Sequence, residues 1–316
     1  MNKKWKGHIA ILCASVLFGI NIPISKSLLD TIGPFGWSFT RASVACLCFW
    51  IVSLLLPRER LVCKRDFWML VVCALFGMVV NQLFFVVGLA STSSIDASII
   101  STTVPVLVML IAALVLKEPI THMKVAGVLI GAAGALLLVL SGAHSAVGSK
   151  SLHGDLFCLG SSLSYAVYLV ISKPLAQRYS PVTVMKWTFL FSSCFLLPTS
   201  MIDLGRLNIA AFDTQLSLQV SYSLILGTFV PYLLVPLALK KLRPTTISMY
   251  NYVQPLVASL LAVIVLHDSF TWLKCLAAVL VFTGVYVVNK SKSRAQMEAE
   301  KAASNTQIAD NPSSAG

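Results

Sequence analysis

Apolar runs of about 20 residues recur along the whole of this chain and restrict its fold more than any other feature. A helix of about 20 residues crosses the hydrocarbon core of a bilayer, which is roughly 30 Å thick. Charged residues make up only 11% of the 316 residues, less than half of the roughly 25% found in soluble domains. A β-barrel would alternate apolar and polar residues in short segments, and the chain does not. The sequence therefore predicts an all-α integral membrane protein.

The apolar runs predict ten transmembrane helices. Their expected bounds are 7–29, 36–56, 67–89, 94–116, 122–141, 154–173, 183–203, 218–239, 244–266 and 271–290. The stretch 291–316 is polar and rich in small residues, so we expect a disordered tail there.

Lysine and arginine residues are unevenly divided between the two sides of the predicted bundle. With a cytoplasmic N-terminus, 18 of them fall on the cytoplasmic side and three on the opposite side. Cytoplasmic loops of membrane proteins carry an excess of basic residues, so both termini are predicted to be cytoplasmic. The basic residues flank the apolar runs rather than forming one dense patch, which argues against nucleic acid as a partner despite a net charge of +12.

Several other functions lack their sequence signatures. The eight cysteines lie almost all inside the apolar runs without CxxC or zinc-ligand spacing, so we expect no disulfide framework, metal site or cofactor. No nucleotide-binding Walker loop is present. A membrane enzyme acting on lipid-linked substrates would need clustered carboxylates, histidines or a nucleophile, and the sequence shows no such cluster.

The two halves of the apolar region resemble each other at a nearly constant offset. At an offset of 150 residues, "LKEPITHMK" (116–124) aligns with "LHDSFTWLK" (266–274), and Gly77 aligns with Gly227. At the start of each half the offset is 147, where "GHIAILCASVLFGINIPISK" (7–26) aligns with "GDLFCLGSSLSYAVYLVISK" (154–173). The shared polar residues between the runs indicate an internal duplication of a five-helix unit.

The predicted units occupy residues 1–146 and 147–290. Five is an odd number, so the second unit enters the membrane from the opposite face. Inverted repeats of this kind are typical of secondary transporters, whose substrate site lies between the repeats near the bilayer midplane. A pseudo-two-fold axis in the membrane plane makes inward-open and outward-open states nearly equivalent. We therefore predict alternating access at a central cavity.

The ensemble of these features resembles the EamA family of the drug/metabolite transporter superfamily over roughly residues 7–290. An acidic residue follows the fourth and ninth spans, each of these spans contains a proline ("TTVPVL", "YVQPLV"), and "GDLFCLGSSLSYAVYLVISK" is similar to the start of that family's second unit. The resemblance implies an inner-membrane carrier of small metabolites, often amino acids, that frequently exports them. The alternatives are a membrane enzyme and an assembly subunit without transport activity.

Polar side chains within the spans are the candidate substrate-binding residues, because such groups are costly when they face lipid. Ser98, Ser101 and Pro105 lie on one helical stripe of the fourth span, and Asn251 and Pro255 repeat this spacing in the ninth. The stripes suit either a substrate site or hydrogen bonds between helices. The full set of candidates is Asn21, Arg41, Asn81, Gln82, Ser98, Ser101, Tyr165, Tyr168, Tyr232, Tyr250, Asn251 and Gln254.

Arg41 lies five residues into the second span from the predicted outer side. It could bind a substrate carboxylate, or it could extend to the outer interface, and the length of an arginine side chain favours the second role. Lys186 in the seventh span is closer to its cytoplasmic end, so extension to the interface is favoured there too.

None of the twelve acidic residues lies in the middle of a predicted span. Proton-coupled carriers commonly keep a carboxylate or histidine in the membrane interior. We therefore expect facilitated diffusion, exchange, or coupling through an end residue such as Asp96. Glu118 and Asp268 are interpreted as loop residues that cap the following helix together with Thr121 and Thr271, and this role is favoured over gating.

The fifth span carries Gly127, Gly131 and Gly134 on one close-packing face. Small residues at this spacing allow two helices to approach closely, either within one bundle or between two copies of the chain. We favour a contact within the bundle, and predict a monomer or a homodimer.

Overall fold

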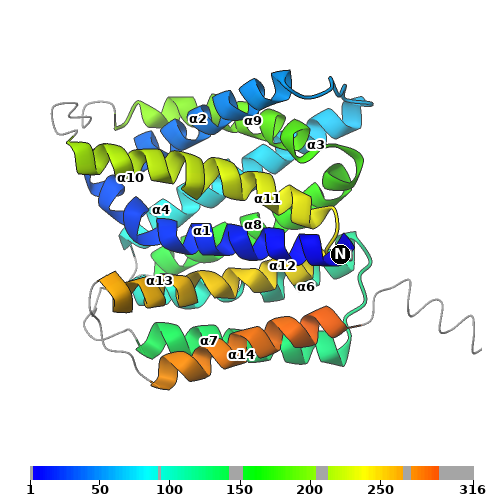
Figure 1. Ribbon diagram of the computed structural model, residues 1–316, viewed down its shortest axis with the longest axis vertical. Coiled ribbons are helices and arrows are strands. Elements are labelled where there is room, and N and C mark those ends of the chain that lie inside the picture. The colour runs from blue at the N-terminus through cyan, green and yellow to red at the C-terminus, as the bar shows by residue number, and fades with distance from the viewer. Residues whose placement is uncertain (1–2, 92–93, 142–151, 204–212, 266–271, 292–316) are drawn as a thin grey trace, which may run out of the picture.

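The computed structural model describes residues 3–91, 94–141, 152–203, 213–265 and 272–291 (Figure 1). Over these ranges the chain is helical and forms no strand. Eight helices in these ranges are long and apolar enough to cross a membrane, and His122–Leu137 is a shorter apolar helix. The structure confirms the all-helical membrane fold, while the count of ten spans stays a prediction. The predicted tail over 291–316 lies outside the described residues except for Ser291.

The helices follow the predicted spans closely in position. The first half contains α1 (Lys3–Ile32), α2 (Pro34–Leu54), α3 (Lys64–Ala74), α4 (Asn81–Ser91), α5 (Ser94–Ser101), α6 (Val104–Val115) and α7 (His122–Ser141). The second half contains α8 (Leu152–Arg178), α9 (Pro181–Ser200), α10 (Thr214–Leu224), α11 (Val230–Leu239), α12 (Pro244–Met249), α13 (Val253–Val265) and α14 (Trp272–Lys290).

The fourth and ninth predicted spans are each interrupted rather than continuous. In the first half the break separates α5 from α6, and in the second half a 3-10 turn, Tyr250–Tyr252, separates α12 from α13. Pro105 and Pro255 lie just after these breaks, where a missing N–H cannot continue the helical hydrogen-bond ladder. The Tyr252 hydroxyl donates to the Thr102 carbonyl at 2.8 Å, so each break meets the other.

The two halves interleave along the whole bundle. Helix α2 packs along α9 at one edge, and α7 packs along α14 at the opposite edge (Figure 1). Between them, α1 packs against α11 and α13, while α8 packs against α4 and α6. One large cluster of buried apolar side chains runs through both halves. Most of the extensive helix contacts therefore join the first half to the second.

Two carboxylates cap the paired helices α2 and α9 reciprocally. Asp203, which follows α9, accepts hydrogen bonds from the backbone N–H groups of Phe35 and Gly36 at 2.7 and 3.0 Å. Glu59, which follows α2, accepts a hydrogen bond from the Ser180 N–H at 2.9 Å. A carboxylate at a helix N-terminus satisfies free N–H groups and interacts favourably with the helix dipole. The two caps fix α2 against α9, and α2 carries much of the site described below.

Gly284 on α14 brings that helix into backbone contact with α7. A Cβ atom on Gly284 would lie 2.6 Å from the Gly127 carbonyl oxygen and 2.6 Å from the Gly131 nitrogen. A Cβ atom on Gly134 would lie 2.9 Å from the Ala277 carbonyl oxygen. The predicted contact of this glycine face within the bundle is confirmed.

Gly284→Ala should lower the melting temperature of the protein in detergent, because the added methyl group would meet backbone atoms of α7 rather than side chains that can rotate away. We expect a destabilisation of about 1–3 kcal/mol. Thr283→Ala on the preceding residue, whose side chain is exposed, should cost no more than about 0.5 kcal/mol. Equal melting temperatures for the two variants would contradict this packing.

The Glu59 cap predicts a pH dependence of stability. Burial raises the pKa of Glu59, but hydrogen bonds from Thr183 and Ser180 and the charge of Lys240 outweigh it and hold the pKa below its usual value. A depressed pKa in the folded state stabilises the fold above the unfolded-state pKa, and this contribution is lost as the pH falls through the folded-state pKa. Acidification should therefore shrink the melting-temperature difference between the parent and Glu59→Gln. A difference that is constant from about pH 7 to about pH 3 would contradict this role.

Candidate functional site

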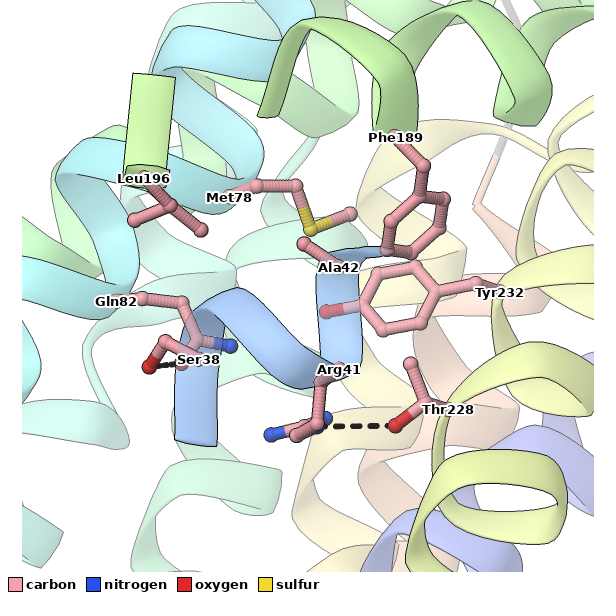
Figure 2. Close-up of a pocket in the computed structure, with 9 residues that line it drawn as sticks. All are labelled: Ser38, Arg41, Ala42, Met78, Gln82, Phe189, Leu196, Thr228 and Tyr232. Carbon is pink, nitrogen blue, oxygen red and sulfur yellow. Dashed lines mark hydrogen bonds between the residues drawn. The ribbon is translucent and has the colours of Figure 1, made fainter. Parts of the chain in front are cut away.

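A pocket lies where α2 and α9 meet the middle of the two helical stretches α3–α4 and α10–α11 (Figure 2). Its void of about 240 Å³ includes the solvent space at its mouth. In this conformation the lining side chains leave room for about one water molecule, so the pocket is nearly closed. It is lined by Ser38, Arg41, Ala42, Met78, Gln82, Phe189, Leu196, Thr228 and Tyr232.

Two short π-helical segments carry part of this lining. Leu75–Val80 joins α3 to α4, and Ile225–Phe229 joins α10 to α11. The two segments begin at equivalent positions of the repeat, at the offset of 150 residues. A π turn inserts an extra residue into a helix and is frequent at functional sites. The lining itself comes in pairs at that offset, because Met78 corresponds to Thr228 and Gln82 corresponds to Tyr232.

The glycines of the π segments have no side chain, which leaves space for a side chain from the first helix of the other half. A Cβ atom on Gly77 would overlap the ring of Tyr168 on α8, and a Cβ atom on Gly227 would overlap the amide of Asn21 on α1. Tyr168 and Asn21 correspond at the offset of 147. Both side chains are buried, and the Asn21 Oδ1 and Tyr168 hydroxyl oxygens have no hydrogen-bond partner among the described residues. These two candidates thus pack behind the pocket wall.

Arg41 turns into the pocket instead of extending to the interface, contrary to the role favoured from its position in the sequence. Its Nε donates a hydrogen bond to the Thr228 hydroxyl oxygen at 2.9 Å (Figure 2). The Thr228 hydroxyl donates in turn to the Ser223 carbonyl at 2.8 Å, across the π segment. The hydroxyl group that holds Arg41 belongs to the other half of the chain, so local sequence around Arg41 could not indicate it.

Gln82 and Tyr232 point toward each other from opposite sides of the pocket (Figure 2). The Ser38 hydroxyl lies 3.2 Å from Gln82 Oε1 and 2.8 Å from the Pro34 carbonyl oxygen. The Tyr232 ring packs edge-on against Phe189, with ring centroids 5.1 Å apart. The pocket therefore combines polar groups from α2, α4 and α11 with an aromatic and aliphatic wall.

A second layer of the sequence candidates continues from Tyr232. Tyr165 on α8 interacts with Tyr232 and with the Asn251 side chain. The rings of Tyr165 and Tyr168 have centroids 6.0 Å apart. Gln254 Nε2 lies 3.4 Å from Asn251 Oδ1, so it joins the same polar layer.

The remaining candidates have partners outside the pocket. Asn81 Nδ2 donates to the carbonyl and hydroxyl oxygens of Ser161, both at 3.0 Å. Ser101 is exposed and donates to the Ala97 carbonyl at 2.9 Å, while Ser98 on α5 is half-buried. The Tyr250 hydroxyl lies 2.9 Å from His8 Nδ1, near the beginning of α1. Asn81 and Tyr250 thus join helices to one another in this conformation, and none of these four residues lines the pocket.

Six lining residues were not candidates from the sequence: Ser38, Ala42, Met78, Phe189, Leu196 and Thr228. Thr228 could have been found from helical spacing, since it lies four residues before the candidate Tyr232. The apolar members carry no such signal, because their residue types are common throughout the spans.

A separate polar cluster closes the end of the bundle at which α1 begins. Glu118 Oε2 lies 3.0 Å from Lys124 Nζ and accepts a hydrogen bond from the Thr245 hydroxyl at 3.0 Å. The Lys124 side chain is fully buried, and its backbone N–H donates to the Thr121 hydroxyl oxygen at 3.2 Å. The predicted cap by Thr121 is confirmed, whereas Glu118 reaches across to α12 in the other half. Asp268 and Thr271, expected to repeat this arrangement, lie outside the described residues.

The sequence profile of the EamA-like transporter family matches the chain twice, over residues 5–140 and 152–290. This protein belongs to the EamA-like transporter family. It is 25% identical over 288 residues to a protein of Archaeoglobus fulgidus named "Uncharacterized transporter", covering 89% of this chain and 96% of that one. It is 28% identical over 303 residues to "Uncharacterized transporter YvbV" of Bacillus subtilis, covering 93% and 95%.

A solved structure titled "Crystal structure of protein" superposes with a TM-score of 0.73 at 19% identity, covering 90% of this chain and 95% of that chain. This likeness concerns the fold alone. Membership of the EamA-like family confirms the resemblance seen in the sequence. The protein is a membrane transporter and not an enzyme.

Proposed function

We propose that this EamA-family protein is a secondary carrier of small organic metabolites such as amino acids, which it exports across the inner membrane. The observation that carries the proposal is the pocket, because its walls come from both halves of the chain and include polar side chains among apolar ones. Arg41, Gln82 and Tyr232 contact the substrate in this proposal, and Tyr165, Asn251 and Gln254 form a layer behind them.

The same proposal gives the chain ten spans as two inverted five-helix repeats, 1–146 and 147–290, with both termini cytoplasmic. The separate family matches to each half support the duplication. The helix contacts support a two-fold relation, because exchanging the halves converts α1–α11 into α8–α4 and α1–α13 into α8–α6. The same exchange converts α2–α9 and α7–α14 into themselves.

Alternating access is supported by the positions of the pocket and of the Glu118 cluster. In the proposed orientation, the α2 residues of the pocket lie within the first turns from the outer end, whereas Glu118, Lys124 and Thr245 lie at the cytoplasmic end. The cluster joins the α6–α7 loop to α12 and must separate for the pocket to open to the cytoplasm. None of the nine lining residues is acidic or a histidine, which favours exchange or facilitated diffusion over a proton relay within the pocket.

Ala42→Leu tests the assignment of the pocket, because Ala42 lines it and is 4% exposed. Three extra carbon atoms would occupy the space of a small solute, so transport by reconstituted vesicles should fall at least about tenfold. The assay measures efflux and uptake of a panel of labelled metabolites, with melting temperature as a check on folding. Ala133→Leu on the exposed face of α7 is the matched control and should transport like the parent.

Equal transport by Ala42→Leu and Ala133→Leu would exclude this pocket as the route. If the parent moves no compound of the panel in either direction, the alternative of an assembly subunit without transport activity replaces the carrier.

Glu118→Gln tests the cytoplasmic closure, because the substitution removes the charge that holds Lys124 and leaves a side chain of similar shape. Breaking a buried ion pair costs several kcal/mol, so the closed state should lose population. Ser248 is fully buried near Thr245 on α12. A single cysteine at position 248, introduced into a cysteine-free variant, therefore reports opening. Its labelling by an impermeant thiol reagent from the cytoplasmic side should be about tenfold faster.

Lys117→Gln is the control for this experiment, because Lys117 is an exposed neighbour whose substitution changes the loop charge without touching the cluster. If Glu118→Gln labels no faster than Lys117→Gln, the cluster is not the closure.

A further inference from the structure

We propose that the pocket selects small monocarboxylates with an apolar body, and that Arg41 binds the carboxylate. This inference names the substrate class and rests on the carrier function proposed above. A substrate must carry a carboxylate to bind, whereas the ammonium group of an amino acid is not needed.

The first support is the charge of Arg41. A guanidinium remains charged at every physiological pH, and a charge inside the membrane needs a compensating partner. Among the described residues, the two ion pairs are Glu118–Lys124 and Asp66–Arg178, and neither includes Arg41. The nine residues that line the pocket include no acid. An anionic substrate would supply the missing negative charge.

The second support is the way in which Arg41 is held. Its Nε is occupied by Thr228, whose own hydroxyl hydrogen goes to the Ser223 carbonyl. The four N–H groups on the two terminal nitrogens have no hydrogen-bond partner among the described residues, and one of these nitrogens points away from Thr228 (Figure 2). An arginine fixed at Nε keeps a planar fork of donors, and such a fork matches the two oxygens of a carboxylate.

Lys186 shows what a satisfied cation in the same bundle looks like. Its Nζ donates to the Ser53 hydroxyl oxygen at 2.9 Å and lies 5.1 Å from the centre of the Trp50 ring. The hydroxyl oxygen and the aromatic face satisfy the Lys186 ammonium group, which does not line the pocket. Arg41 has one hydroxyl contact and opens onto a cavity, so a purely structural role accounts for Lys186 better than for Arg41.

The other polar groups of the pocket also suit an anion. Gln82 Oε1 faces the Ser38 hydroxyl, so its amide N–H groups remain available as donors. The Tyr232 hydroxyl is a further potential donor that points into the pocket (Figure 2). No carboxylate is present in the lining to pair with a substrate ammonium group. The pocket thus offers a donor set for one negative charge and no ionic partner for a positive one.

The apolar wall and the single cation define the rest of the substrate. Ala42, Met78, Phe189 and Leu196 surround the polar groups and would contact an aliphatic or aromatic body. A second carboxylate would meet no second cation there, and leaving a charge unpaired in this setting is costly. A monoanion with one apolar end is therefore preferred to a dicarboxylate and to an amine.

The test compares leucine with three relatives and one dianion in the reconstituted full-length protein. The relatives are 4-methylpentanoate, which lacks the amino group, 3-methylbutylamine, which lacks the carboxylate, and leucinamide, whose carboxylate is neutralised; the dianion is succinate. Binding is measured as the rise in melting temperature, and uptake is measured separately in vesicles. Leucine and 4-methylpentanoate should bind the parent, while the amine, the amide and succinate should bind at least about tenfold more weakly.

Arg41→Gln should weaken carboxylate binding by about 10- to 100-fold, the usual range for losing hydrogen bonds to a charged group. Arg41→Lys keeps the charge without the fork, so it should bind with intermediate affinity and serves as the second variant if Arg41→Gln is unstable. Lys186→Gln removes a cation of the same bundle outside the pocket and should bind like the parent.

The outcomes separate this inference from the carrier function. Binding of the amine or the amide to the parent as tightly as 4-methylpentanoate would overturn the inference. So would the absence of any carboxylate binding, or carboxylate binding that is equal in the parent and in Arg41→Gln. Carboxylate binding that depends on Arg41 but leads to no uptake would uphold the inference and overturn the carrier. Uptake of the amine that is independent of Arg41 would uphold the carrier function and overturn the inference.

Discussion

Hydrocarbon supplies no hydrogen bonds and no counter-ions, and this constraint organises the whole molecule. Polar groups of the spans must be satisfied by other helices or gathered around a hollow. Where the backbone of one half is interrupted at Thr102, the hydroxyl of Tyr252 from the other half donates to the free carbonyl in place of water. Where α2 and α9 begin, a carboxylate from the end of the partner helix caps the free N–H groups. The halves are thus held together by the polar groups that each could not satisfy alone.

The same constraint explains why the site lies where the irregular backbone is. The π segments place Met78 and Thr228, and after them Gln82 and Tyr232, at the meeting point of the two halves. Thr228 serves two purposes there, because its hydroxyl satisfies a carbonyl of its own helix and holds Arg41 from α2. Arg41, a charge that is expensive inside a membrane, lies at this pocket.

Sequence analysis predicted the helical fold and most helix positions, because apolar length and the loop charges are local properties. The cost of polar side chains within spans also pointed to Gln82 and Tyr232, which do line the pocket. Pro105 and Pro255 indicated irregular helices, but nothing in the local sequence indicated that the π segments begin at Leu75 and Ile225. The direction of Arg41 depends on a threonine 187 residues away, so its placement required the tertiary structure. Ser101, which fitted the predicted stripe, donates to its own helix instead.

The central claim is that two related five-helix units cross the membrane with opposite orientation. Single cysteines in place of Arg60 and Asp213, both exposed, would mark the segment after α2 and the start of α10 in a cysteine-free background. The account predicts that an impermeant thiol reagent added to intact cells labels the cysteine at position 213 and leaves that at position 60 unlabelled until the membrane is opened. Labelling of both positions from the same face would contradict the inverted arrangement and the shared pocket that depends on it.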